Sequence, residues 1–519
     1  MGFRAGGQDT ALRERAARLA LVSVLACAPL MLVAAPLCAQ EDADGVLTLE
    51  RLVELGLRDS YRVRQLQMGI DRTRALLRAE QAGLKSSVDL EITAPQFQSI
   101  SEYEFDSQTQ RNILVHQDTR RWEAELSIRQ PVILFGIPTN GYLSLNNRMY
   151  RYDQLDEDDR DVRYYNRYFI AYEQPLFQPN TMRNDLLEAQ LNVEEAELDY
   201  QDDVVGMIDD LAGDYFDLFE YAYERLIAEH TVQNLEVAMA AAQEVVTRDP
   251  TRAIEMDQLQ VAVANAREEV QAAESGYRLL ASSIRQDLRL PESEPLTVEP
   301  AIEVSPIRID VQRAIELAST LAPRLRSLEI QRQMSEIQLE EARGRNGFRV
   351  DLELTYGREV QDPRFERLWQ DPRNSYTVNV EAYVPIWDWG ERDHRIAAQR
   401  ISLERAELQI AEAQSQIASS VANQVQNLAE YQQRALNMQD NLAFARQITA
   451  TTLERYRAGE VALVDVLQTI DREAQTAENL LDAFLGYRNA LMSLQELTFY
   501  DFEYDMPLLE RFAVLGGGE

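Results

Sequence analysis

The sequence has few of the residues from which disulfides, metal centres or catalytic sites are built. It contains two cysteines and three histidines in 519 residues. Both cysteines lie in the first forty residues, and the histidines at 116, 230 and 394 have no metal-ligand spacing. No nucleophile elbow, phosphate loop or zinc motif is present. We therefore expect no enzyme, no cofactor and no metal site.

Positive charge is also scarce. Lysine and arginine total 52, against 87 aspartate and glutamate residues. Because nucleic-acid binding needs a basic surface, this balance argues against DNA or RNA as a partner. Beyond the first forty residues, no apolar run approaches the roughly 20 residues of a transmembrane helix. If the rest of the chain crosses a membrane, it must do so as a closed β-barrel.

The first forty residues have the layout of a secretory signal peptide. Basic residues precede an apolar run over 19–39, and an acidic stretch follows at 40–44. We expect cleavage after Ala39, which would remove both cysteines. A retained signal anchor is one alternative. A lipoprotein signal with Cys27 as the lipidated residue is another, although the apolar run continues past Cys27.

The chain contains two copies of one unit. Residues 88–92 match 350–354, one of three motif pairs with an offset of 262. Residues 174–177 match 384–387 at an offset of 210, and another pair matches at 208. The shared order of these motifs indicates an internal repeat. We divide the chain into a signal peptide, two repeats and a C-terminal tail, over 1–39, 40–300, 301–500 and 501–519.

Period-two alternation marks six candidate strands. They lie near 88–92, 122–128, 143–149, 163–175, 350–356 and 376–382. Each has one apolar and one polar face, as in a barrel between lipid and a wet lumen or in a water-facing sheet on a soluble core. Tyrosine and tryptophan at the strand ends favour the barrel. Two strands lie in about 52 residues, within 93–173, that only the first repeat carries. This extra segment forms either a second hairpin or a folded extracellular loop.

Very long helices are expected after the strands of each repeat. Residues 181–248 and 390–457 contain no proline, and 68 residues of helix measure roughly 100 Å. Their apolar residues recur every seventh position, as at Leu191 and Leu198, which is typical of supercoiled helices. A cytoskeletal type of coiled coil is the alternative, and the strands and signal count against it. Each repeat should also begin with one shorter helix, over about 48–83 and 308–343.

Several motifs resemble the TolC-like outer-membrane efflux protein family. Residues 383–390 look like the family's strand-to-helix junction, and 174–177 like its counterpart in the first repeat. Residues 455–467 are similar to the hairpin near the family's C terminus, with an aromatic residue, a glycine and then Asp-Val-Leu. The resemblance extends in order over 46–500.

This resemblance implies an α+β membrane protein of a Gram-negative bacterium. Three copies would form one outer-membrane β-barrel, continued by a long periplasmic α-helical barrel. The extra segment would give this barrel more strands than the family's usual twelve. The family passes small molecules or proteins outward in tripartite efflux or type I secretion systems, with a periplasmic adaptor and an inner-membrane transporter as partners. The alternative is a structural coiled-coil protein of the envelope without a pore. The sequence does not name the cargo.

The resemblance places the periplasmic mouth at two hairpin tips, near 249–257 and 456–465. Three copies would turn Asp257 and Asp465 into carboxylate rings that select cations. The alternative is that each aspartate only stabilises a helix start. Bonds that hold the mouth shut are predicted for Tyr456, Arg252 and Arg457. The adaptor would dock on Pro250, Thr251, Ala458, Gly459 and Glu460.

Two features depart from the family's pattern or invite another interpretation. The first tip has Pro250 where the family commonly has a glycine, although proline ends a helix by itself. The acidic run at 156–161 lacks the spacing of a calcium loop. We interpret it as a solvated extracellular loop.

Overall fold

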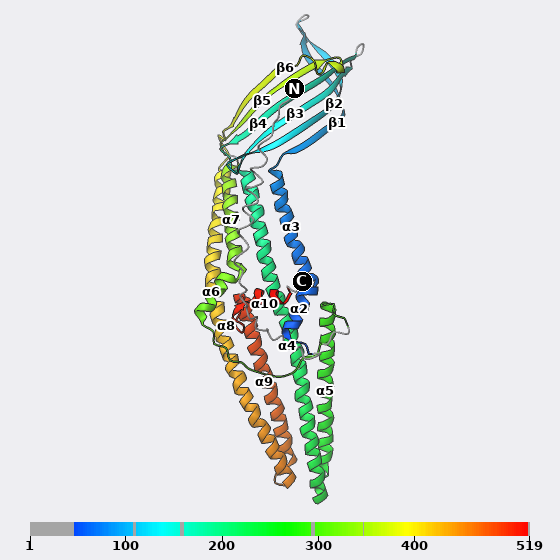
Figure 1. The fold of residues 1–519 in the computed structure, drawn as a ribbon, viewed down its shortest axis with the longest axis vertical. Coiled ribbons are helices and arrows are strands. Elements are labelled where there is room, and N and C mark those ends of the chain that lie inside the picture. The colour runs from blue at the N-terminus through cyan, green and yellow to red at the C-terminus, as the bar shows by residue number, and fades with distance from the viewer. Residues whose placement is uncertain (1–45, 107–109, 156–159, 292–295, 346, 517–519) are drawn as a thin grey trace, which may run out of the picture. The chain divides into compact units, whose positions relative to one another are not determined.

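The computed structural model describes residues 46–106, 110–155, 160–291, 296–345 and 347–516 (Figure 1). The chain divides into Met1–Val46 and a compact unit over Leu47–Glu519, and the latter is described here. The predicted signal peptide, both cysteines and most of the acidic run at 156–161 lie outside the described residues.

All six expected strands are present, and they form one antiparallel sheet (Figure 1). Their order in the sheet follows their order in the chain. The extra segment of the first repeat supplies a hairpin that lies within this sheet, between the first strand and the fourth. The strands are β1 (Ser87–Asp106), β2 (Arg111–Leu134), β3 (Ile137–Leu155), β4 (Arg160–Leu176), β5 (Arg349–Asp362) and β6 (Arg373–Tyr383).

The strand register separates the sheet into an apolar face and a polar face. Residues that pair directly across strands lie on the same face. One continuous row crosses all six strands on the apolar face: Val88, Ile128, Leu145, Ile170, Tyr356 and Tyr376. All six side chains of this row are exposed. A second row lies on the polar face: Glu91, Glu125, Arg148, Arg167, Glu359 and Arg373.

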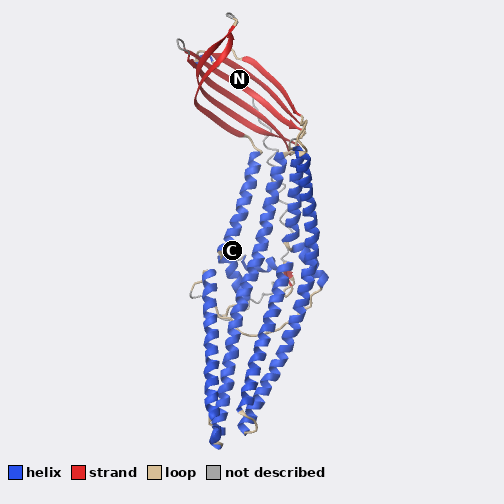
Figure 2. Cartoon of the chain, turned by 180° about the vertical axis from the view of Figure 1, so that it is seen from behind, coloured by secondary structure: helices blue, strands red, loops and turns tan. Residues whose placement is uncertain are grey.

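Helices make up most of the remaining chain, separate from the sheet (Figure 2). The two long helices were predicted correctly to within one residue, and each has 68 residues. Among the described residues, no helix is both long and apolar enough to cross a membrane. The helices are α2 (Leu49–Asp59), α3 (Tyr61–Gly83), α4 (Thr181–Arg248), α5 (Ile254–Asp287), α6 (Val311–Leu321), α7 (Pro323–Gly344), α8 (Glu391–Ala458), α9 (Leu463–Thr498) and α10 (Leu508–Gly516).

The prediction of one helix at the start of each repeat was wrong, because each is broken in two. Ser60 separates α2 from α3 with an extended backbone, and its side chain accepts a hydrogen bond from the Arg62 amide. Serine favours this capping position. Ala322 separates α6 from α7 in the same way, because Pro323 disfavours a helical residue before it. Ser60 and Ala322 differ by the repeat offset of 262, so the break belongs to the repeated unit.

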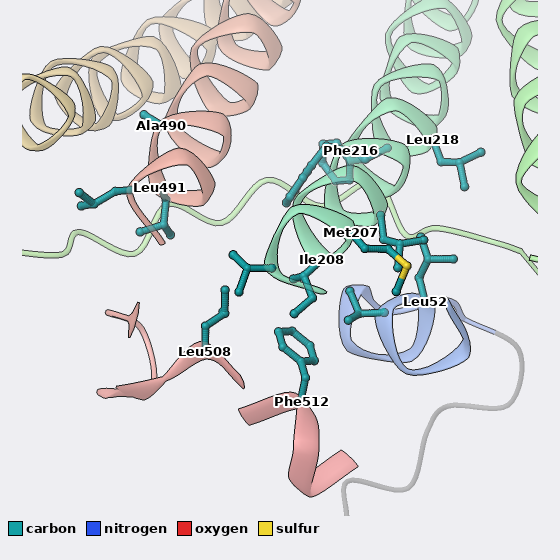
Figure 3. Packing of buried hydrophobic residues seen from close by; sticks show 14 of the residues in the cluster. Leu52, Met207, Ile208, Phe216, Leu218, Ala490, Leu491, Leu508 and Phe512 are labelled. Carbon is teal, nitrogen blue, oxygen red and sulfur yellow. The ribbon is translucent and has the colours of Figure 1, made fainter. Parts of the chain in front are cut away.

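The main hydrophobic core lies near the middle of α4, where α2 and α10 pack against α4 and α9 (Figure 3). Leu52 of α2, Ile208 of α4, Leu491 of α9 and Phe512 of α10 are buried there. The C-terminal segment also contains a small hairpin of β7 (Tyr500–Asp501) and β8 (Met506–Pro507). A separate apolar cluster lies near the two hairpin tips, where α4 is followed by α5 and α8 by α9.

Candidate functional site

The first hairpin tip joins α4 to α5 without a glycine. Asp249 has an extended backbone, and a short 3-10 helix over Pro250–Arg252 follows it. The Asp249 carboxylate accepts hydrogen bonds from the Thr251 amide at 3.1 Å and the Thr251 hydroxyl at 2.6 Å. These bonds favour the ionised form and hold the pKa of Asp249 below its usual value. The aspartate cap and the proline therefore build the turn that glycine would otherwise allow.

The second tip joins α8 to α9 and depends on Gly459. This glycine has a φ of +81°, in the left-handed region. Its amide donates to the Tyr456 carbonyl, and the Glu460 amide donates to the Arg455 carbonyl, as in a Schellman motif. A Cβ atom added at Gly459 would meet nothing within 4 Å. Glycine is therefore required by the backbone conformation and not by lack of space.

The predicted docking residues all lie on the surface of the tips. These residues are exposed at both tips. Glu460 lies 3.3 Å from Arg455 in an exposed ion pair. Their role in docking remains a prediction. The residues concerned are Pro250, Thr251, Ala458, Gly459 and Glu460.

The two aspartates of the predicted rings occupy the first turns of the helices that follow the tips. Asp465 accepts a hydrogen bond from the Ala462 amide at 3.1 Å, which stabilises the start of α9. Asp257 lies in the first turn of α5. Both side chains are exposed. The helix-start interpretation therefore has direct support at Asp465, and the ring, which needs further copies of the chain, remains a prediction.

Tyr456 joins the second hairpin to the first. Its side chain is completely buried, and its hydroxyl donates a 2.5 Å hydrogen bond to Oε2 of Glu255 in α5. The other oxygen of Glu255 accepts a 2.8 Å bond from Arg252, whose guanidinium lies 5.3 Å from the centre of the Tyr456 ring. Two of the predicted residues, Tyr456 and Arg252, thus meet through Glu255, which the sequence analysis did not name.

Electrostatics keep this contact in one protonation state. Burial, followed by the hydrogen bond to the Glu255 carboxylate, raises the pKa of Tyr456. The hydrogen bond to Glu255 also raises the pKa of Arg252. Near neutral pH the phenol therefore remains a donor and the guanidinium remains charged. The spacing of Arg252 and Glu255 by three residues was the available signal for this pair.

Arg457 also reaches the first hairpin. Its backbone carbonyl accepts a 2.6 Å hydrogen bond from Arg248 at the end of α4. Its side chain lies 3.9 Å from Glu244, and both groups are exposed. An exposed pair at that distance contributes little energy. The link through the carbonyl and the Tyr456 contact therefore carry most of the connection between the two tips.

An acidic stripe runs along α4, above the tips. It consists of carboxyl groups at intervals of seven residues: Glu188, Glu195, Asp202 and Asp209. Burial, followed by repulsion from nearby carboxylates, raises the pKa of each of them. This stripe was not predicted from the sequence, although its carboxyl groups follow the same sevenfold period as the apolar positions three residues later.

A buried carboxylate lies between the two hairpins. Glu473 of α9 is 4% exposed and lies 3.3 Å from Nδ1 of His230 in α4. Arg446 of α8 lies 3.9 Å from the same carboxylate. These side chains line a cavity of about 100 Å³. Among the described residues, no group of three or more histidine, cysteine or acidic side chains could hold a metal ion.

Comparison with known proteins gives one family match and several similar structures. Residues 314–498 match the model of a family described as "Outer membrane efflux protein". This agrees with the family resemblance of the sequence motifs. A search of curated proteins found no match.

Three of the similar structures are described as outer membrane proteins or channels. The chain resembles the CmeC outer membrane channel of Campylobacter jejuni with a TM-score of 0.61 and 12% identity, over 90% of this chain and 89% of that chain. The open-state MtrE outer membrane channel of Neisseria gonorrhoeae gives 0.60 and 13%, over 87% and 88%. VceC of Vibrio cholerae gives 0.59 and 13%, over 88% and 95%. At these identities, the likeness establishes a shared fold alone.

Proposed function

We propose that this chain, whose residues 314–498 match the outer membrane efflux protein family, is the outer-membrane exit duct of a tripartite efflux or type I secretion system. The sheet carries this proposal. Its exposed apolar row suits contact with lipid, and its charged row suits a water-filled lumen. A soluble protein would expose no such row on six adjoining strands.

Three copies form the duct. Their sheets close one barrel in the outer membrane of a Gram-negative cell, with the apolar face outward. Their long helices continue the duct through the periplasm, where 68 residues of helix extend roughly 100 Å. No catalytic group is needed, because the protein only provides a path. The transporter in the inner membrane selects the cargo, which is either small molecules or proteins.

The hairpin tips form the gate of the duct. In each copy, Tyr456, Glu255 and Arg252 hold the second hairpin against the first and keep the mouth closed. Opening requires this contact to separate. Asp257 and Asp465 form rings around the mouth and select cations. The periplasmic adaptor docks on the exposed tip residues, beside the contact that it must release.

Single-channel recording in planar bilayers tests the duct and the ring together. The matched variant is Asp465→Asn, because an asparagine oxygen can still accept the hydrogen bond from Ala462 while the charge is removed. We expect discrete cation-selective steps from the wild-type protein and weaker cation selectivity from the variant. Unchanged selectivity would refute the ring and leave the duct intact. Absence of steps from folded, oligomeric protein would refute the duct and favour a structural coiled-coil protein.

A further inference from the structure

We infer that the barrel has eighteen strands and that β6 of each copy pairs with β1 of the next copy in a register set by the internal repeat. This inference rests on the proposed trimeric duct, in which three copies each contribute a six-stranded sheet. The partner at the sheet edges is therefore a second copy of this chain.

The extra hairpin β2–β3 is a full part of the barrel wall. The apolar row passes through it without a break, from Val88 through Ile128 and Leu145 to Ile170. On the polar face, Arg148 pairs with Glu123, and Arg129 lies 3.5 Å from Glu173 of β4. A loop folded over the barrel would not be expected to continue the apolar and polar faces of the neighbouring strands β1 and β4. The hairpin therefore adds two strands per copy to the circumference.

The two edges of the sheet are complementary. β1 begins just after α3 and runs away from the helices, whereas β6 runs back toward α8. The two edge strands are antiparallel, so β6 of one copy can pair with β1 of the next as every other pair in the sheet does. In a single chain both edges expose apolar side chains, with Ile92 at 70% and Val380 at 61%. Unpaired edges of this kind need to be covered.

We call the pairing of β6 with β1 of the next copy the seam. The internal repeat predicts its register. Within one chain, the junction between the repeats is the β4–β5 pair, where Tyr172 lies opposite Leu354. Subtracting the offset of 262 from Leu354 gives Ile92 in β1, and adding 210 to Tyr172 gives Ala382 in β6. Ile92 and Ala382 both lie on the apolar face, so the predicted pair preserves the two faces of the sheet.

The seam is long enough to cross the membrane. β6 contains 11 residues, and a barrel strand needs about 9–11 to span the hydrocarbon region. On β1, the irregularity between Thr93 and Gln96 marks the point beyond which the simple register no longer applies. Eighteen strands at usual spacing and tilt give a diameter of about 36 Å, against about 24 Å for twelve. Barrels of this size leave an aqueous channel, so the barrel wall itself would not be the constriction of the duct.

Cysteine cross-linking of the full-length protein tests the seam. The double variant Ile92→Cys/Ala382→Cys places both thiols on the same face of the predicted pair, where cross-strand Cβ atoms come within about 5 Å. We expect oxidation to give a covalent ladder that ends at three chains. The control Ile92→Cys/Glu381→Cys places the thiols on opposite faces and should give far less product. The wild-type protein, whose only cysteines are Cys27 and Cys38, and each variant with one introduced cysteine should give none.

The possible results separate this inference from the proposed function. Wild-type conductance tests the duct independently of the cross-link. If the protein conducts but Ile92→Cys/Val380→Cys cross-links better than the predicted pair, the register is wrong. If it conducts and neither apolar-face pair cross-links, the seam is wrong. A ladder that ends at two chains would mean twelve strands and would overturn the count of eighteen.

Discussion

Replacing Tyr456 with phenylalanine should weaken the closed state of the proposed gate. The substitution removes the hydroxyl that donates the 2.5 Å hydrogen bond to Glu255. It leaves the ring in the apolar cluster with Leu259 and Val466, and it leaves the bond between Arg252 and Glu255 in place. The perturbation is therefore confined to one buried, charge-assisted hydrogen bond between the two hairpins.

The structure sets the size of the expected effect. A hydrogen bond to a charged group contributes about 1.5–3 kcal/mol. Glu255 is 15% exposed, so solvent replaces little of what the phenol supplied. If the bond exists only in the closed state, Tyr456→Phe shifts the closed-to-open equilibrium by roughly 10- to 150-fold per chain. Single-channel recording should show this shift as a larger fraction of time in the open state.

Tyr487→Phe is the matched control. Tyr487 is also buried, and its hydroxyl donates a 2.9 Å bond to the Ser305 carbonyl, but it lies in the main core and not at the tips. This control should lower the melting temperature and leave the open fraction unchanged. The role of the Tyr456 bond in closing the mouth is refuted if both variants change the open fraction equally, or if Tyr456→Phe forms conducting channels with the wild-type open fraction.

Two further predictions concern stability. Gly459→Ala should destabilise the second tip by about 1 kcal/mol, because a φ of +81° is unfavourable for alanine although there is space for its Cβ atom. A melting temperature equal to that of the wild type would contradict this. Desolvation raises the pKa of Glu195 and Asp202 in the folded chain above their unfolded values. Protonation of these groups therefore stabilises the folded chain. This stabilisation is fully present below about pH 4 and is lost as the pH rises through the folded-state pKa values. Glu195→Gln/Asp202→Asn should therefore raise the melting temperature at pH 7.5 and reduce the gain on acidification, as followed by circular dichroism. Parallel pH profiles for wild type and variant would argue against desolvation and mutual repulsion of these carboxylates.

The sequence by itself determined the strands, the long helices and the resemblance to the outer membrane efflux protein family. The alternation of apolar and polar residues by two and the recurrence of apolar residues by seven can be recognised within one segment of sequence. They do not depend on what that segment packs against. The breaks at Ser60 and Ala322 also had local causes, a capping serine and a following proline, which the long helical pattern obscured. Helix boundaries of this kind depend on one residue, whereas helix existence depends on many.

The tertiary structure alone decided which residues meet at the tips. Tyr456 and Arg252 could be named from the tip motifs, but the contact between Tyr456 and Glu255 could not, because these residues are 201 positions apart and their contact depends on how α8 lies against α5. Asp465 could be placed at a helix start, and only the structure shows its bond to Ala462. The partial desolvation of the α4 carboxylates and the placement of the extra hairpin within the sheet were decided in the same way, because both depend on segments that are distant in the sequence.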